Sequence, residues 1–187
     1  MVANPARRTQ LAHAAITVLG TEGPRALTHR AVDRQAGLPL GTCANYFPTR
    51  AELLLAMAHE VFQLLAPDPD RLEQLADLPV EDAAAGYATY VTERLLEHPH
   101  VATALIELRL EAARSEDVRA VLAPVLQQGF EADVAFHQER GLPGGRDQVL
   151  LMHHVVNGAV LDALTIPLHP ESPAGDVVAQ AARRLTA

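Results

Sequence analysis

The 187-residue chain is 49% apolar but only 4% aromatic, and its net charge is −8 at pH 7. This length can bury a hydrophobic core in one or two domains, and the single cysteine, Cys43, excludes an intramolecular disulfide. No signal-peptide core follows the first arginines, and no apolar run reaches the roughly 18 residues of a membrane span. Ala, Leu and Val supply most of the apolar share. The sequence therefore predicts a helical protein of the reducing cytoplasm.

The charge is divided unevenly along the chain, which has no lysine. Residues 1–65 contain six arginines and four acids, a balance of +2, whereas the remainder contains nine arginines and nineteen acids, a balance of −10. The net charge argues mildly against a nucleic acid partner. A mildly basic amino-terminal part is nevertheless compatible with phosphate binding at one end of the chain.

Four helices are expected in the first 65 residues, each from a local start or stop signal. Asn4 followed by Pro5 is typical of a helix start, and the glycines at 20 and 23 stop that helix. Thr28 can cap the next helix, and Thr49 with Glu52 forms a capping box. The second, third and fourth helices are expected near residues 29–35, 39–46 and 50–65, with Pro39 starting the third.

The sequence PDPD at 67–70 is the clearest break in the chain, and only helices are expected beyond it. Ser115 can cap the helix that opens with two acids, and Pro124 is expected to kink or split that helix. We see no strand pattern, internal repeat or low-complexity segment. The expected helices lie near residues 70–77, 81–97, 101–114, 116–140, 147–165 and 173–185.

The two short helices around Gly37 predict a helix-turn-helix. In that motif the second helix enters the major groove of DNA, and its first turns face the base edges. Small residues there let the backbone approach the bases. Thr42 can bond a base or contact a thymine methyl, and Asn45 suits adenine. Arg50 and Tyr46 would flank this helix and hold phosphates.

Residues 9–65 resemble the DNA-binding domain of TetR-family transcriptional regulators. The resemblance is contiguous and keeps the spacing of the family pattern over about a third of the chain. It rests on Gly23, Leu27-Thr28, Ala36-Gly37-Leu38, the run Gly41-Thr42-Cys43-Ala44-Asn45-Tyr46-Phe47, and Thr49-Arg50-Ala51-Glu52-Leu53.

The resemblance implies an all-α protein with an N-terminal three-helix helix-turn-helix domain and a C-terminal helical bundle for ligand binding and dimerisation. We expect the DNA-binding domain over 1–48, a connecting helix over 49–66, and the bundle over 67–187. It also implies a ligand-responsive regulator, by family default a repressor, that binds double-stranded DNA as a homodimer on a near-palindromic operator. The effector is an unidentified small molecule, and no cofactor is expected.

The predicted DNA-binding residues come from the second helix, the recognition helix and their flanks. Ala44 stands where the family commonly has Tyr, and Pro39 where a Ser cap is frequent. Arg50 replaces the usual Lys, which keeps the charge but changes the geometry. These departures bear on which operator is read. The predicted residues are Thr28, His29, Arg30, Leu40, Gly41, Thr42, Ala44, Asn45, Tyr46 and Arg50.

Several of these residues also have a purely structural interpretation. Phe47, Leu38, Leu27 and Val32 are expected in the core, and Cys43 is expected to be a small packed residue, with redox sensing as the alternative. Tyr46 could instead cover a helix junction. Arg7 and Arg8 are expected to form a solvated arm that attracts phosphates without sequence preference.

The last two long helices are expected to pair with their mates in the dimer. The run VLLMHHVVNGAVLDAL is apolar on more than one side, and Gly158 with Ala159 would allow a close approach. One wide internal core is the alternative. A ligand pocket inside the bundle would draw on isolated polar and apolar side chains, namely Tyr87, Tyr90, Leu105, Arg109, Phe130, His137, Met152, His153 and Asn157.

A competing hypothesis is an enzyme or small-molecule carrier on a helical bundle with a vestigial DNA-binding end. No nucleophile–base set, glycine-rich phosphate loop or metal motif supports catalysis, so no catalytic residue is expected. Nine histidines suggest a metal, but His153 and His154 are adjacent and point about 100° apart on a helix. No metal site is therefore expected.

Overall fold

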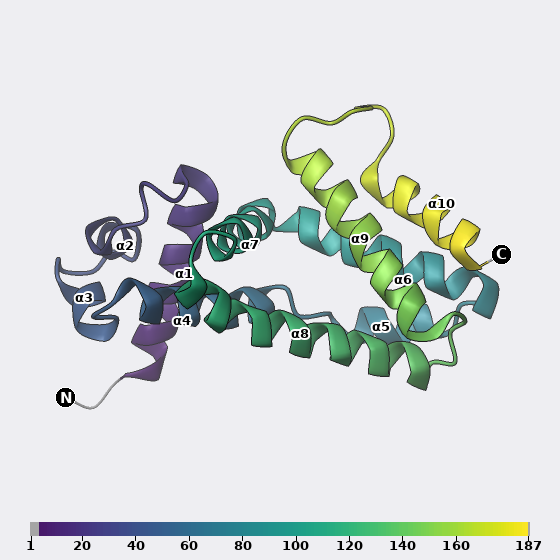
Figure 1. The fold of residues 1–187 in the computed structure, drawn as a ribbon, viewed down its shortest axis with the longest axis horizontal. Coiled ribbons are helices and arrows are strands. Elements are labelled where there is room, and N and C mark those ends of the chain that lie inside the picture. The colour runs from purple at the N-terminus through teal and green to yellow at the C-terminus, as the bar shows by residue number, and fades with distance from the viewer. Residues whose placement is uncertain (1–3, 187) are drawn as a thin grey trace. The chain divides into compact units, whose positions relative to one another are not determined.

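A computed structural model describes residues 4–186, which form ten α-helices and, within that range, no strand (Figure 1). The all-α class predicted from the sequence is confirmed. None of the described helices is long and apolar enough to cross a membrane. The helices are α1 (Pro5–Glu22), α2 (His29–Gln35), α3 (Thr42–Tyr46), α4 (Arg50–Leu64), α5 (Pro69–Ala76), α6 (Val80–Glu97), α7 (Pro99–Ala112), α8 (Glu116–Glu139), α9 (Gly145–Leu164) and α10 (Ala174–Thr186).

The chain packs as two compact units that interleave along the sequence. Unit 1 contains the residues up to 65 together with 98–126, and unit 2 contains 66–97 and 127–187. The helix α8 contributes its first half to unit 1 and its second half to unit 2. The helix-turn-helix segment therefore shares a core with α7, a helix that follows it by more than fifty residues.

Three helices of unit 1, α1, α2 and α4, begin at the caps that the sequence predicts. Asn4 accepts the Arg7 backbone N–H at 3.3 Å, and Thr28 accepts that of Ala31 at 3.2 Å. Thr49 and Glu52 form the complete capping box at the start of α4. Such caps satisfy backbone donors that have no partner within the helix.

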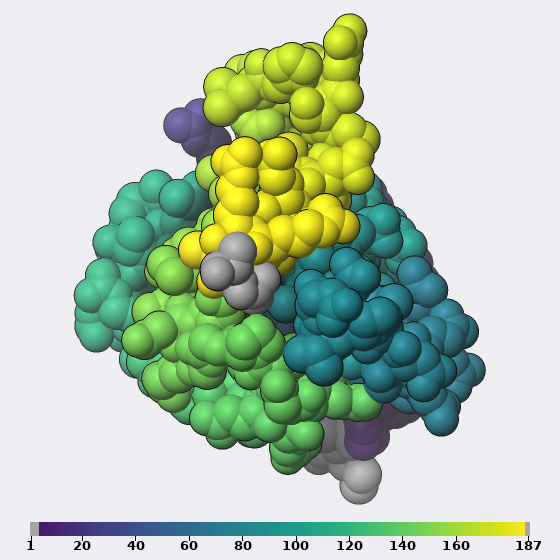
Figure 2. All heavy atoms as spheres, turned by 90° about the vertical axis from the view of Figure 1, so that its right-hand side faces the viewer, coloured from purple at the N-terminus to yellow at the C-terminus, as the bar shows by residue number. Residues whose placement is uncertain are grey.

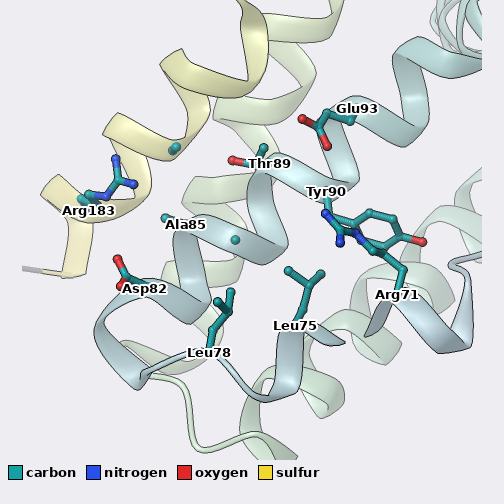
Figure 3. A pocket seen from close by; sticks show the side chains of 11 residues that line it. Arg71, Leu75, Leu78, Asp82, Ala85, Thr89, Tyr90, Glu93 and Arg183 are labelled. Atoms are coloured by element: carbon teal, nitrogen blue, oxygen red, sulfur yellow. The ribbon is translucent and has the colours of Figure 1, made fainter. Parts of the chain in front are cut away.

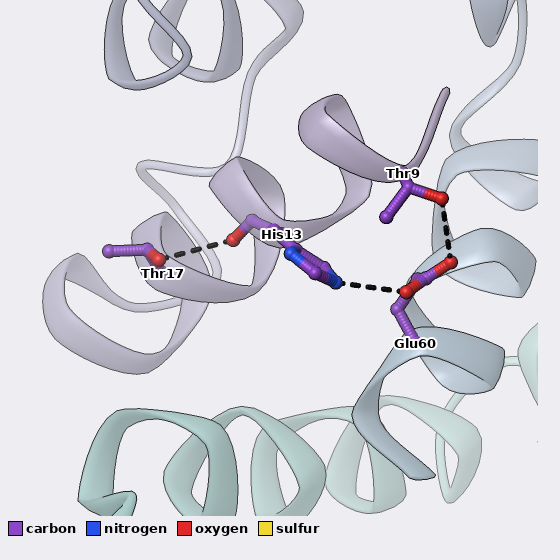
Figure 4. Close-up of polar contacts among 4 residues, drawn as sticks. All are labelled: Thr9, His13, Thr17 and Glu60. Carbon is purple, nitrogen blue, oxygen red and sulfur yellow. Dashed lines mark hydrogen bonds and ion pairs between the residues drawn. The ribbon is translucent and has the colours of Figure 1, made fainter. Parts of the chain in front are cut away.

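In unit 1, α1 packs against α2, α4 and α7. A side chain at Gly20 would collide with the backbone carbonyl of His100, so only glycine permits this approach of α1 to α7. His13 lies 2.9 Å from one Glu60 carboxylate oxygen, and the Thr9 hydroxyl donates to the other at 3.1 Å (Figure 4). These contacts fasten α1 to α4.

Unit 2 is built around α6, which packs against α5, α9 and α10. Its buried face is formed mainly by alanines, which lets the neighbouring helices approach closely. The second half of α8 reaches α6 through an aromatic contact, in which the Tyr87 and Phe136 rings meet edge to face at 5.1 Å.

Pro124 was expected to kink or split α8. The helix is not split, because it continues from Glu116 to Glu139 across the proline. A proline removes one N–H and crowds one carbonyl, and here the remaining turns of the helix suffice to keep it continuous. Arg7 and Arg8 do not form an arm, because both lie in the first turns of α1.

Candidate functional site

The predicted DNA-binding residues form a surface of unit 1 around α2, α3 and the start of α4. Seven of the ten are exposed, and the other three, His29, Thr42 and Tyr46, are partly exposed. The side chain of Leu40 is 68% exposed, which leaves it free for contact. Phe47, Leu27 and Val32 are buried as expected, whereas Leu38 is only half-buried.

The recognition helix is shorter than the sequence predicts. It begins at Thr42 rather than Pro39, because Gly41 has φ +92° and cannot be part of a right-handed helix. Residues 39–41 form a turn instead. The Thr42 hydroxyl donates to the Pro39 carbonyl at 2.6 Å, so only its methyl group and oxygen lone pairs remain for an outside partner.

A buried carboxylate holds the recognition helix against α2. Asp33 is completely buried, and its two oxygens accept the backbone N–H groups of Gly41 at 2.7 Å and Cys43 at 2.6 Å. Both groups lie at the start of α3, where backbone donors lack helical partners. Asp33 therefore fixes the turn and the first residues of α3 together. In the sequence Asp33 stands out only as a charge, because its two partners lie eight and ten positions away.

Arg8 of α1 holds the other end of α3. Its guanidinium donates to the Tyr46 carbonyl at 2.9 Å and lies 4.4 Å from the centre of the buried Phe47 ring. A carbonyl at a helix C-terminus carries partial negative charge, so a guanidinium there is favourable. Arg8 thus has a positioning role in place of the diffuse phosphate attraction expected for it.

Arg50 connects the start of α4 to two other parts of unit 1. It donates to the Leu27 carbonyl at 3.3 Å, and its other terminal nitrogen lies 4.0 Å from the Glu111 carboxylate of α7. Glu111 also lies 3.8 Å from Arg114. A residue predicted to hold phosphate is therefore in contact with a carboxylate that would compete for it.

Cys43 occupies the packed position expected for it and is fully buried in unit 1. Burial, with a smaller contribution from the nearby Asp33 carboxylate, raises the pKa of the Cys43 thiol to about 11. At neutral pH the group is a thiol rather than the thiolate that reacts with oxidants.

The predicted ligand-binding residues divide between the two units. Leu105 and Arg109 lie on α7 in unit 1, and Arg109 is exposed. The other seven lie in unit 2. Among them, Asn157 is on the exposed side of α9, while Met152 is partly buried.

Within unit 2, side chains from α8 meet those from α9 or the turn before it. Phe130 and His153 pack edge to face at 5.3 Å, and His153 also lies 3.0 Å from the Asp133 carboxylate. His137 is buried, with its Nε2 2.8 Å from the Pro143 carbonyl oxygen. The carbonyl is an acceptor, so Nε2 carries the proton.

A hollow of about 310 Å³ opens on unit 2 between α5, α6 and α10 (Figure 3). Of the predicted ligand residues, Tyr90 is among those that line it, and its hydroxyl accepts the Asp68 backbone N–H at 2.7 Å. Four charged side chains also line the hollow, two of each sign: Arg71, Arg183, Asp82 and Glu93. Since these charges balance, the hollow favours no particular ligand charge.

No group of three or more His, Cys, Asp or Glu side chains in the described part of the chain could hold a metal ion.

Comparison with known proteins places this architecture in a family. A family model described as the tetracyclin repressor-like C-terminal domain matches residues 79–187, more than half of the chain. The chain belongs to the TetR family of transcriptional regulators. The HTH-type transcriptional regulator BetI of Rhizobium meliloti (strain 1021) is 31% identical over 119 residues. That match spans 63% of this chain and 58% of BetI, so it covers less than two thirds of the relative.

Solved structures give the same fold over nearly the whole chain. The multidrug binding protein EbrR complexed with imidazole is 26% identical, with a TM-score of 0.72 over 98% of this chain and 97% of EbrR. The ethidium complex of EbrR gives the same identity and TM-score over 98% and 99%. A putative TetR-family regulator from Rhodococcus sp., at 19% identity, matches with a TM-score of 0.74 over 98% and 100% and shows the fold alone. These comparisons point to a transcriptional regulator, not to an enzyme.

Replacing Asp33 tests its role in holding α3. In Asp33→Ala two backbone N–H groups, one of them buried, lose their acceptor, and we expect the free energy of unfolding to fall by about 3 kcal/mol. Asp33→Asn should lose at least half as much, because the amide oxygen can accept one bond while the amide NH2 faces the other N–H, donor against donor. Urea denaturation of the full chain measures both.

The exposed neighbour Gln35→Ala serves as the control and should change stability by less than about 0.5 kcal/mol. Equal stability of Asp33→Ala and this control would show that the two bonds do not hold the helix.

Proposed function

We propose that this TetR-family chain is an effector-responsive repressor that binds a near-palindromic DNA operator as a homodimer. The observation that carries the proposal is the exposed recognition surface of α3, held at its start by Asp33 and at its end by Arg8. Its base-reading groups are few. Thr42 and Asn45 are the polar side chains of α3 suited to base edges, and Leu40 and Ala44 add apolar contact.

The phosphate contacts in this proposal come from residues around that surface. Thr28 and Tyr46 supply hydroxyl groups, and Arg30 and Arg50 supply charge, with His29 beside them. Gly41 lies on the same surface, but its N–H is already donated to Asp33, so it contributes close approach only. Such contacts fix the protein on the duplex without reading its sequence. A regulator of this kind acts where the genome lies, so we place it in the cytoplasm.

A homodimer through α9 and α10 is the second part of the proposal. Exposed residues of α9 recur at helical spacing and include Leu150, Leu151, Gly158 and Leu161, so they form one stripe. The groove of about 380 Å³ between α9 and α10 adds Val177 and Leu185. Figure 2 looks onto the side of the molecule where α10, in yellow, lies at the surface. Apolar surface of this kind is typical of a protein interface.

The effector is proposed to bind in unit 2 and to act on unit 1 through chain connections. The candidate residues are those named above on α6, α8 and α9, while Leu105 and Arg109 of α7 belong to unit 1 and fall outside this site. Three covalent connections join the units, at 65–66, 97–98 and within α8 at 126–127. A ligand changes DNA binding only if it prefers one arrangement of the helices. Small shifts matter, because two recognition helices must match half-sites about 34 Å apart.

The first test distinguishes base recognition by Asn45 from phosphate binding by Arg50. The full-length protein is used to select duplexes from a randomised library and is then titrated with the selected duplex at several salt concentrations. Asn45→Ala should change the preferred base at one or two positions. Arg50→Ala should weaken all duplexes similarly and lower the salt slope by about 1.

No preference of the wild type over random duplex would contradict DNA regulation. Identical effects of the two substitutions would contradict the assigned roles.

The second test concerns the competition for Arg50. Removing the carboxylate in Glu111→Gln should free the guanidinium for phosphate and tighten DNA binding about two- to fivefold at low salt, the size expected for one exposed ion pair. The matched control is Glu107→Gln, which removes the same charge one turn earlier in α7. In an Arg50→Ala background the gain should vanish. Equal gains from both glutamates would instead indicate general charge repulsion.

The third test concerns the dimer. Leu161 on α9 is 46% exposed and Leu110 on α7 is 47% exposed, so the same substitution at each compares two equally exposed apolar positions. Leu161→Arg should shift the protein toward monomer in sedimentation velocity, because it places a charge in the proposed interface. Leu110→Arg should leave the dimer intact. A dimer that tolerates Leu161→Arg would refute this interface.

A further inference from the structure

Arginines cover three of the four aromatic rings of unit 2. An aromatic face attracts cations, and this attraction is how many proteins recognise organic cations. Here a protein cation is already in place beside each of these rings. The contacts are Arg94 with Tyr90 at 5.4 Å, Arg140 with Phe136 at 5.3 Å and Arg146 with Phe130 at 4.8 Å, from guanidinium carbon to ring centre. A cationic ligand on these rings would meet a neighbouring positive charge.

The described residues of unit 2 also offer no buried acid to a cation. Their buried polar side chains are Thr92, His137 and Gln148. The α8 acids near the aromatic rings are exposed and already paired, Glu131 with Arg146 and Asp133 with His153. A buried organic cation would therefore lack a counter-charge, which makes its burial costly.

Whereas the described part of unit 2 offers a cation no buried acid, it does contain three buried hydrogen-bond donors that have no acceptor. The Tyr87 hydroxyl, the Arg94 Nε and the Gln148 Nε2 are each buried without a hydrogen-bond partner. Gln148 as a whole is only 6% exposed. Native proteins satisfy the great majority of such groups, since each unpaired one costs stability. All three donors lie in unit 2, and each could donate to a ligand that carries acceptor atoms.

Gln148 borders the turn between α8 and α9, and Tyr87 packs against α8 near the end of that helix. The Tyr87 ring packs against Phe136, and the next residue, His137, bonds the Pro143 carbonyl of that turn. Gln148 packs on the same turn, because a side chain at Gly144 would fall 2.6 Å from the Gln148 Cβ. Arg94 lies two turns beyond Tyr87 on the same face of α6, about 10 Å along the helix.

We propose that the effector is an organic acid, with a carboxylate or sulfonate on an apolar body. Its oxygens accept hydrogen bonds from Tyr87 and Gln148, and Arg94 supplies a charged donor further along α6. The inference rests on the proposed effector-responsive function. It differs from what the EbrR complexes alone would suggest, because the ethidium bound there is a cation.

Two probes with the same ring system and opposite charge test the ligand class. The full-length protein is titrated with 2-naphthoate and with 2-naphthylmethylammonium by isothermal calorimetry. We expect naphthoate to bind at least about tenfold more tightly, the factor that one hydrogen bond to a charged group provides. Equal or tighter binding of the ammonium overturns the proposal, and so does failure of both probes to bind.

Removing the donors distinguishes a ligand site from a structural role. Tyr87→Phe and Gln148→Leu should each weaken naphthoate binding about tenfold or more, yet leave the urea midpoint unchanged or higher, because an unpaired buried donor is lost. The matched control Gln128→Leu changes an exposed glutamine on α8 and should keep naphthoate affinity. A lower urea midpoint in both donor variants would show that the donors serve the fold, and the proposal would fail.

Operator binding by the same preparations separates this inference from the function on which it rests. If the protein selects an operator but prefers the ammonium probe, only the acid-effector inference fails. If it prefers naphthoate but binds no DNA sequence selectively, the regulatory function fails while the ligand chemistry stands.

Discussion

The DNA-facing surface depends on one buried carboxylate. Asp33 is fully enclosed, and the two backbone groups that it accepts fix both the turn at Gly41 and the first turn of α3. A five-residue helix has too few internal hydrogen bonds to hold itself in place. Other helices must therefore hold it in place, and Asp33 of α2 and Arg8 of α1 do so. The small residues of α3 follow from this arrangement, since Cys43 packs directly on the carboxylate that binds its N–H.

Unit 1 also contains α7, which joins the recognition surface to a later part of the chain. Gly20 lets α1 approach the start of α7, and Glu111 near its end contacts Arg50 at the start of α4. A displacement of α7 would therefore act on both α1 and Arg50. Transmission through the connecting helix α4 alone would leave out α7, which packs against both α1 and α4.

Features encoded by neighbouring residues were predictable from the sequence, whereas features that join distant residues were not. The caps at Asn4, Thr28 and Thr49 depend on atoms three positions away, so the sequence pattern contains them. Arg8 contacts Tyr46 across 38 positions, and only the fold brings them together. The sequence placed Gly41 inside a helix. Its left-handed backbone goes with a hydrogen bond to Asp33, eight positions away, which the local pattern does not contain. Leu105 and Arg109 were grouped with the bundle because the sequence does not reveal that α7 joins unit 1.

The unpaired donors of unit 2 link stability to regulation. A site whose donors lack acceptors is less stable empty than filled, so a ligand that supplies the acceptor favours the filled arrangement by its binding energy. Tyr87 and Arg94 both lie on α6, which leads through His98 directly into α7. An acid held by both residues would constrain two turns of α6 at once, whereas a ligand held at one end would not. For the proposed acid effector, the spacing of the donors along α6 therefore favours an elongated molecule.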